Sequence, residues 1–185
     1  MRSCETIERV GTGKSPPYRG FLLDTTRLSP GMSTRTRLPD DGVEAEMRVY
    51  IWCDGAAMPN GGPAGAGYVV VGGVHLLGSE ALGDATNNVA EYKAVRNALR
   101  AAADAGATSA HVRMDSPVVF GHLSGASRAR AEHLIQLKEE VEAQMARYPG
   151  RVTFTRIPRE RNGVADELAK DGARASKGLS ADPRR

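Results

Sequence analysis

Apolar positions become regular only from residue 48 onward, and their pattern changes along the chain. Runs rich in β-branched, aromatic and other apolar residues predict strands, and they lie at 48–53, 68–71, 74–77, 110–114 and 151–157. Gly72-Gly73 separates the second run from the third, which is typical of a hairpin. A glycine-rich stretch over 60–67 is interpreted as a connection between strands.

Between these runs, apolar residues recur three and four positions apart, which predicts helices. The predicted helices run from Asn88 to near Gly106, from Ser116-Pro117 onward, over 128–147, and from Asn162 to about 175. Asn88 is the expected cap of the first, with Glu91 as its capping-box partner. The resulting order, β-β-β-α-β-α-α-β-α, predicts an α/β protein with a mixed sheet and helices on its faces.

Residues 1–46 differ from the rest of the chain, because they are rich in Gly, Pro, Ser, Thr and Arg without a sustained period. We expect a disordered extension there. Gly11–Ser15 resembles the end of a phosphate-binding loop, but Glu8 replaces its first glycine and Pro16-Pro17 blocks the helix that must follow. We therefore predict a folded domain over 47–175 and a flexible basic tail over 176–185.

The composition limits the classes of protein to which the chain can belong. A chain of 185 residues with 41% hydrophobic and 25% charged residues is typical of one soluble domain. No apolar run reaches the length of a membrane span, and the N-terminus lacks the apolar region of a secretory signal. Two cysteines, Cys4 and Cys53, do not make a disulfide framework, so we expect a cytoplasmic protein.

Net charge alone says little about partners. The chain carries +3 with a pI near 9.0, which suggests a polyanion partner. Residues 47–175, however, contain 15 basic and 14 acidic residues, so the expected domain has a net charge of only +1. The overall charge therefore does not identify a nucleic-acid-binding protein.

Four acidic residues occupy positions that suggest chemistry. Asp54 and Asp115 each end an apolar strand, Glu91 lies one turn before its helix's apolar stripe, and Asp166 edges the inward stripe of the last helix. If the two strands are neighbours, the four carboxylates converge and raise one another's pKa. Two Mg²⁺ ions would compensate that charge and suit phosphodiester hydrolysis. Taken singly, the two aspartates are better interpreted as turn residues and Glu91 as a helix cap. The four together with the surrounding motifs favour the metal site instead.

The surrounding motifs resemble type 1 ribonuclease H. The matching segments are Asp54-Gly-Ala with the glycine-rich run to Tyr68, Thr86-Asn-Asn-Val-Ala-Glu91, Asp115-Ser116, and Asn162-Gly-Val-Ala-Asp166. They occur in the family's order over 48–175. The resemblance implies a ribonuclease H-like fold with a five-stranded mixed sheet, and hydrolysis of the RNA strand of RNA–DNA hybrids.

The resemblance also assigns roles by position. It implies that Asp54, Glu91, Asp115 and Asp166 are the catalytic tetrad and bind two Mg²⁺ ions, with Mn²⁺ as an alternative, and that Asp54 bridges both ions. Positions expected to bind substrate are Gly55, Ala56, Asn60, Asn87, Asn88 and Ser116. Recognition along the minor groove fits contacts to 2′-hydroxyls. Asn87 and Asn88 also fit a purely structural role as helix caps.

The chain departs from the common family pattern in the loop before the last helix. Residues 156–161 contain no histidine, as in a bacterial and archaeal branch of the family, and Arg159 or Glu160 is the candidate to assist there. Pro117 stands where a glutamine often follows the Asp-Ser pair. We expect a monomer. The alternatives are a nuclease of the same fold acting on DNA junctions or single strands, and a non-catalytic nucleic-acid-binding module.

Overall fold

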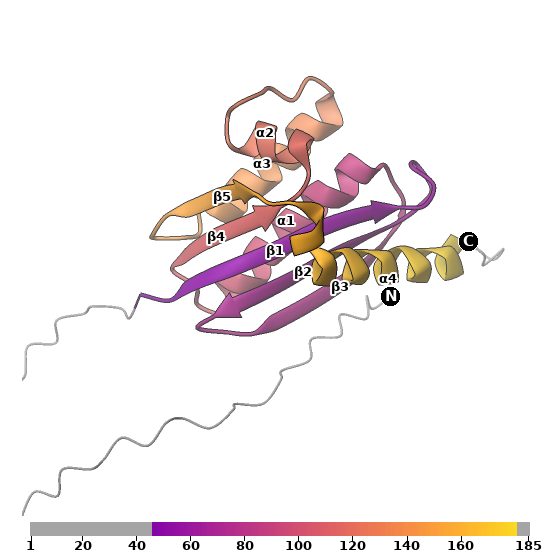
Figure 1. The fold of residues 1–185 in the computed structure, drawn as a ribbon. Helices are drawn as coiled ribbons and strands as arrows, with labels where there is room; N and C mark the ends of the chain where they lie inside the picture. The colour runs from indigo at the N-terminus through magenta and orange to yellow at the C-terminus, as the bar shows by residue number, and fades with distance from the viewer. Residues whose placement is uncertain (1–45, 181–185) are drawn as a thin grey trace, which may run out of the picture. The chain divides into compact units, whose positions relative to one another are not determined.

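Five strands form one mixed sheet in the order β3-β2-β1-β4-β5 in the computed structural model, which describes residues 46–180 (Figure 1). The strands are β1 Arg48–Ala57, β2 Pro63–Gly72, β3 Leu76–Asp84, β4 Ser109–Met114 and β5 Val152–Arg156. β1 is antiparallel to β2 and parallel to β4. The carboxyl ends of β1 and β4 therefore lie side by side, as the convergence of Asp54 and Asp115 requires.

Helices cover both faces of this sheet, which confirms the predicted α/β architecture (Figure 1). They are α1 Asn87–Asp104, α2 Pro117–Leu123, α3 Glu132–Met145 and α4 Gly163–Ser180, with a short 3₁₀ turn, η1, at Arg159–Arg161. Helix α4 packs on one face, and α1 packs on the other with α3 beside it. The core lies between the sheet and α1, where Val49, Ile51 and Cys53 of β1 are buried.

The glycine-rich stretch is a strand and not the predicted connection. Strand β2 begins at Pro63, and Gly65 and Gly67 lie in its first half. A Cβ at Gly65 would lie 2.3 Å from the Ala169 carbonyl oxygen, and one at Gly67 would lie 2.4 Å from that of Ala165. Glycine is therefore required because the backbone of α4 lies directly against the strand.

The predicted start of the first long helix is also corrected. Thr86, not Asn88, is its cap, and the Thr86 hydroxyl accepts a hydrogen bond from the Val89 amide at 3.4 Å. Glu91 does not form the expected capping box, because its carboxylate accepts hydrogen bonds from other side chains. The third helix is shorter than predicted and begins at Glu132. The cap of α2 by Ser116 is confirmed.

Helix α4 continues past the predicted boundary at 175, so the first half of the expected flexible tail is helical as far as Ser180. Ser176 explains the extension. Its buried hydroxyl donates to the Ala64 carbonyl at 2.6 Å and accepts from the Gly83 amide at 3.0 Å, which anchors the helix to β2 and β3. The predicted extension over 1–46, with Cys4 and Gly11–Ser15, lies outside the described residues except for Glu46.

Two general expectations concern the described part of the chain. Cys53 is a free, buried thiol in β1. Within residues 46–180, no helix has the length and apolar character needed to cross a membrane.

Candidate active site

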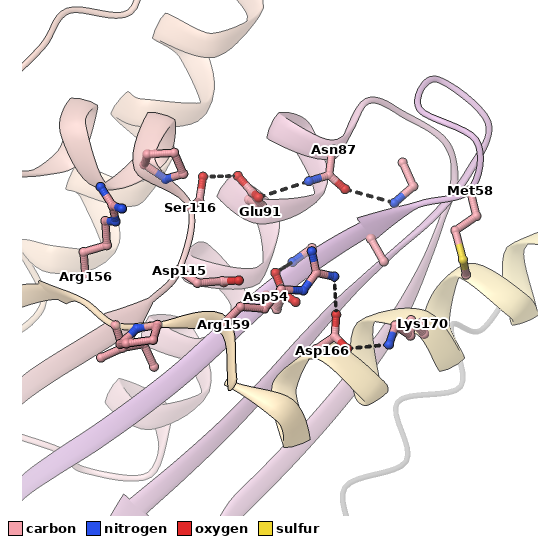
Figure 2. Close-up of a pocket in the computed structure, with 16 residues that line it drawn as sticks. Asp54, Met58, Asn87, Glu91, Asp115, Ser116, Arg156, Arg159, Asp166 and Lys170 are labelled. Atoms are coloured by element: carbon pink, nitrogen blue, oxygen red, sulfur yellow. Dashed lines mark hydrogen bonds and ion pairs between the residues drawn. The ribbon is translucent and has the colours of Figure 1, made fainter. Parts of the chain in front are cut away.

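A pocket of about 500 Å³ opens at the carboxyl ends of β1 and β4 and contains all four predicted acidic residues (Figure 2). Asp54 comes from β1, Glu91 from α1, Asp115 from the segment after β4, and Asp166 from α4. Four elements that are distant in sequence thus bring their carboxylates to one place. This juxtaposition argues against four independent turn or capping roles.

Asp54 is the most deeply placed of the four, with only 7% of its surface exposed. Its Oδ1 accepts a hydrogen bond from the Gly55 amide at 2.9 Å. Burial, and after it the nearby charge of Asp115, raises the pKa of Asp54 from 3.8 to about 8. The ionised form of this carboxyl therefore needs additional positive charge at the bottom of the pocket.

Glu91 is oriented by two side chains at the pocket wall. Asn87 donates to its Oε1 at 3.1 Å, and the Ser116 hydroxyl donates to its Oε2. Burial raises the pKa of Glu91 to about 7, although the hydrogen bond from Ser116 opposes the rise. Gly55 permits this placement, because a Cβ there would lie 2.1 Å from the Glu91 amide nitrogen.

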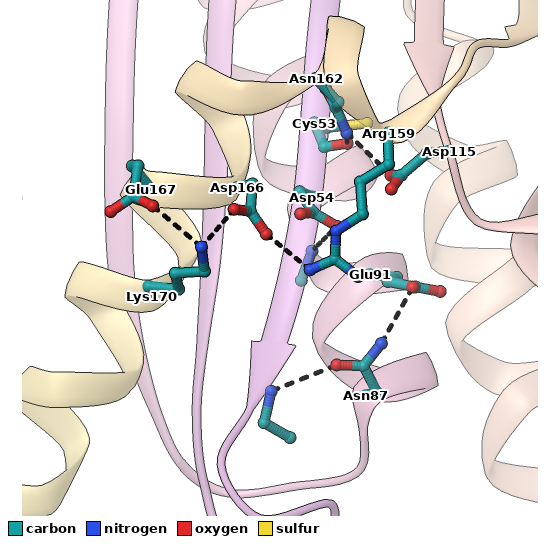
Figure 3. Close-up of polar contacts among 12 residues, drawn as sticks. Cys53, Asp54, Asn87, Glu91, Asp115, Arg159, Asn162, Asp166, Glu167 and Lys170 are labelled. Carbon is teal, nitrogen blue, oxygen red and sulfur yellow. Dashed lines mark hydrogen bonds and ion pairs between the residues drawn. The ribbon is translucent and has the colours of Figure 1, made fainter.

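Asp115 is held by Asn162, a buried residue at the junction of η1 and α4 (Figure 3). The side-chain amide nitrogen of Asn162 donates hydrogen bonds to Asp115 Oδ1 at 2.9 Å and to the backbone carbonyl of Cys53 at 3.0 Å. One side chain thus ties the start of α4 to β1 and to the residue that follows β4. The sequence motif included Asn162, but nothing in its spacing indicated this positioning role.

Asp166 differs from the other acids because two cations contact it. Arg159 reaches its Oδ1 at 2.9 Å and Lys170 reaches its Oδ2 at 2.5 Å (Figure 3). Burial alone would raise its pKa, but hydrogen bonds from Lys170 and Arg159 hold the pKa of Asp166 below its ordinary value. Lys170 was not predicted, and its position four residues after Asp166 on a helix was the available signal.

The predicted substrate-binding residues divide into two groups. Gly55, Ala56, Asn87 and Ser116 line the pocket, as does Arg159. Asn60 lies beside the pocket, and its Oδ1 accepts a hydrogen bond from the backbone N–H of Asn87 at 2.8 Å. The side-chain Oδ1 of Asn87 in turn accepts one from the backbone N–H of Ala57 at 3.2 Å. These bonds brace the rim. Neither Asn88 nor Glu160 lines the pocket.

Comparisons with known proteins agree with this geometry. The model of the family described as "Reverse transcriptase-like" matches residues 53–172. The Ribonuclease HI of Halobacterium salinarum is 36% identical over 146 residues, which cover 77% of this chain and 71% of that protein. The chain belongs to the ribonuclease H family. The match to the family model begins next to Asp54 and continues past Asp166, so all four acidic residues lie within the matched region.

Two further relatives connect this ribonuclease H family member to solved structures. The N-terminal RNase H domain of Rv2228c from Mycobacterium tuberculosis superposes with a TM-score of 0.70 at 36% identity, covering 74% of this chain and all of that one. The chain spans about two fifths of the full curated Bifunctional protein Rv2228c, to which it is 38% identical over 144 residues. LC11-RNase H1, solved in complex with RNA/DNA hybrid, superposes with a TM-score of 0.65 at 31% identity, covering 69% of this chain and 98% of that one.

The donor set of this family member suits a hard divalent cation. All four side chains offer carboxylate oxygens, which Mg²⁺ and Mn²⁺ prefer. The raised pKa values of Asp54 and Glu91 reflect burial and mutual repulsion, which a cation would relieve. Within residues 46–180, however, no three Asp, Glu, His or Cys side chains already enclose a single metal position.

Stability of the metal-free protein should fall as the pH rises. The folded-state pKa values of Asp54 and Glu91, about 8 and about 7, lie above their ordinary values of 3.8 and 4.5. Between those limits the folded protein binds more protons than the unfolded chain, so its free energy of unfolding decreases with increasing pH. Urea unfolding in a chelator, from about pH 5 to about pH 8, should show a larger loss for the wild type than for Asp54→Asn. If the free energy of unfolding fell equally in the two proteins, the raised pKa of Asp54 would not be a cause of the pH dependence.

Proposed function

We propose that this protein is a metal-dependent endoribonuclease that hydrolyses the RNA strand of RNA–DNA hybrids. The observation that carries the proposal is the single pocket in which β1, α1, α4 and the segment after β4 each place one carboxylate. The relative LC11-RNase H1, which was solved with an RNA/DNA hybrid, supports the choice of substrate. We also propose that the protein acts as a monomer in the cytoplasm.

The proposed cofactor is a pair of Mg²⁺ ions, with Mn²⁺ as the alternative, held by Asp54, Glu91, Asp115 and Asp166. Two such ions supply an activated water and stabilise the leaving oxygen in phosphodiester hydrolysis. The chain's own contribution is to orient the ligands. Ser116 and Asn87 fix the carboxylate of Glu91, and Asn162 fixes that of Asp115.

Arg159 and Lys170 have a separate role in this proposal. They balance the charge of Asp166 in the pocket without a ligand, and both line the wall that a nucleic-acid backbone would approach. The Arg159 side chain is 71% exposed, so it can exchange its bond to Asp166 for a phosphate at small cost. We propose that it provides the assistance that a loop histidine gives in other members of the family.

Small and neutral groups shape the proposed substrate surface. Gly55 and Ala56 line the pocket without long side chains, while Asn87 and Ser116 offer neutral hydrogen-bonding groups beside Glu91. Neutral hydrogen-bonding groups suit 2′-hydroxyls, by which a protein distinguishes RNA from DNA. If the four proposed metal ligands are set aside, residues 47–175 contain 15 basic and 10 acidic residues, or +5, which suits a phosphate backbone.

A substrate panel tests the proposal. Full-length protein is incubated with end-labelled hybrid, double-stranded DNA, a DNA junction, and single-stranded RNA, each with Mg²⁺ and with a chelator. We expect internal cleavage of the hybrid's RNA strand alone, and none in the chelator. Preferential cleavage of a junction or single strand would assign a different nuclease activity. Binding of hybrid without turnover in Mg²⁺ or Mn²⁺ would identify a non-catalytic module, and either result would overturn the proposal.

A further inference from the structure

Among residues 46–180, no helix covers one half of the sheet face that carries α4. Helix α4 packs on β2, β3 and the second half of β1, where Asp54 pairs with Gly67. The remaining part of this face is formed by the first half of β1 together with β4 and β5, and no helix of the described chain crosses it in Figure 1. We call this part the open face and define it by Arg48, Tyr50, Trp52, His111, Arg113 and Thr153.

Strand alternation places these side chains together. Val49, Ile51 and Cys53 point into the core on the α1 side, so Tyr50 and Trp52 point the other way. The parallel register sets Tyr50 beside His111 and Trp52 beside Arg113. The next strand adds Thr153, which is paired with His111.

The open face is an aromatic surface interleaved with arginine. The Arg113 guanidinium carbon lies 5.2 Å from the centre of the Tyr50 ring and 4.7 Å from that of Trp52. His111 meets Tyr50 edge to face with ring centres 6.1 Å apart, and its Nδ1 lies 2.8 Å from the Thr153 hydroxyl. Tyr50 is 37% exposed, so its ring is accessible to a ligand on this face.

Its charge restricts the ligand. A pocket of about 410 Å³ on this face is lined by three arginines, Arg48, Arg113 and Arg151, and by one acid, Glu46. Glu46 forms an exposed ion pair with Arg48 at 3.3 Å, so the pocket lining carries two positive charges in excess. Because an exposed pair contributes little, Arg48 can exchange Glu46 for a phosphate. A ligand that matches both properties is anionic and carries flat rings. Polar neighbours such as His111 and Thr153 favour such a ligand over an apolar protein surface.

We propose that the open face is a binding site for single-stranded nucleic acid, with bases against Tyr50, Trp52 and Arg113 and phosphates beside Arg48 and Arg151. Base stacking on aromatic and guanidinium groups, combined with a basic track for the backbone, is the general chemistry of such sites. The site is separate from the acidic pocket. Tyr50 lies four residues before Asp54 on β1, a separation of roughly 13 Å along an extended strand.

Trp52 makes the proposal directly measurable, because it is the only tryptophan in the chain. Full-length protein in a chelator is titrated with a short oligouridylate and a short oligothymidylate, and tryptophan emission and oligonucleotide anisotropy are both followed. We expect saturable quenching that coincides with the anisotropy change. Tyr50→Ala should weaken binding about tenfold, whereas Tyr50→Phe, which keeps the ring, should bind like the wild type.

A second variant pair tests the electrostatic part. Arg48→Ala combined with Arg151→Ala should lower the salt dependence of binding. Lys177→Ala is the charge control, because Lys177 lies far from Arg48 along β1. It follows Ser176, whose hydroxyl donates to Ala64, and Ala64 pairs with Ala57 at the opposite end of the strand. Equal effects of the arginine and lysine changes, or anisotropy without quenching, would overturn the proposal. Concentration-dependent dimerisation that hides Trp52 from oligonucleotide would also overturn it and assign the face to a second copy.

These outcomes do not depend on the proposed nuclease activity. Binding is measured on single strands without divalent metal, so loss of hybrid cleavage leaves the result intact. Conversely, Tyr50→Ala should cleave a blunt hybrid without single-stranded ends at the wild-type rate, because Tyr50 does not line the acidic pocket.

Discussion

Asp54→Asn should lower hybrid cleavage by at least about a thousandfold, because in the proposed mechanism this buried carboxylate would hold the metal ions and so contribute several kcal/mol to the transition state. The substitution keeps the size of the side chain, and the carbonyl oxygen of the new amide can still accept the bond that the Gly55 amide gives to Asp54. We therefore expect the fold to persist. Single-turnover cleavage of a labelled hybrid in Mg²⁺, beside a circular dichroism spectrum and a thermal melt, measures both effects.

Asp171→Asn is the matched control for this prediction. The same Asp-to-Asn change is made at Asp171, which lies on α4 like the acidic-pocket residue Asp166. The side chain of Asp171, however, is 60% exposed and pairs with Arg174 at the protein surface. It should cleave hybrid at close to the wild-type rate, because an exposed ion pair contributes little. Retention of activity by Asp54→Asn would show that Asp54 does not act as a metal ligand. An equal loss in Asp171→Asn would show that the loss is not specific to Asp54.

Much of the fold was predictable because periodicity follows directly from burial. β1 alternates buried Val49, Ile51 and Cys53 with more exposed neighbours, and the apolar stripe of α1 is buried as expected. The first half of β2 was not recognised, because Gly65 and Gly67 carry no side chain from which a period can be read. The property that makes them suitable, close approach of α4, exists only in the folded chain.

The candidate site was also predictable only in part: its acidic residues could be named from the sequence, but the contacts between distant residues could not. The four acids could be named because each marks a strand end or a helix edge, and the pocket brings them together. The contacts that orient them were not predictable in this way. Ser116 reaches Glu91 across 25 residues and Asn162 reaches Asp115 across 47, so only the sheet order determines that they meet.

The packing of α4 on the sheet affects both the stability of the protein and the position of a residue in the acidic pocket. Asp166 enters the pocket from the first turn of α4, and the height of that helix above the sheet is set by its contact with Gly67 and Gly65. Ser176 anchors the opposite end of α4 through Ala64 and Gly83. The carboxylate of Asp166 is therefore positioned by the backbone packing of α4 on β2, which begins at the adjacent residue Ala165, and a change in that packing should affect both unfolding and cleavage.

Gly67→Ala should accordingly destabilise the protein by about 3 kcal/mol or more. The new Cβ would lie 2.3 Å from the Ala169 amide nitrogen and 2.4 Å from the Ala165 carbonyl oxygen. Both are backbone atoms, so no rotamer change can relieve the contact and α4 must move away from β2. Urea unfolding should show a lower midpoint, and cleavage by the remaining folded protein should fall because Asp166 moves with the helix.

Gly178→Ala separates this packing effect from the general consequence of placing alanine in α4. Within the described residues, a Cβ at Gly178 meets no packing neighbour within 4 Å, so the change should be neutral or stabilise the helix by up to about 1 kcal/mol. Its cleavage rate should match that of the wild type. If Gly67→Ala were as stable and as active as Gly178→Ala, the contact between α4 and β2 would not set the position of Asp166, and the link between helix packing and catalysis would be wrong.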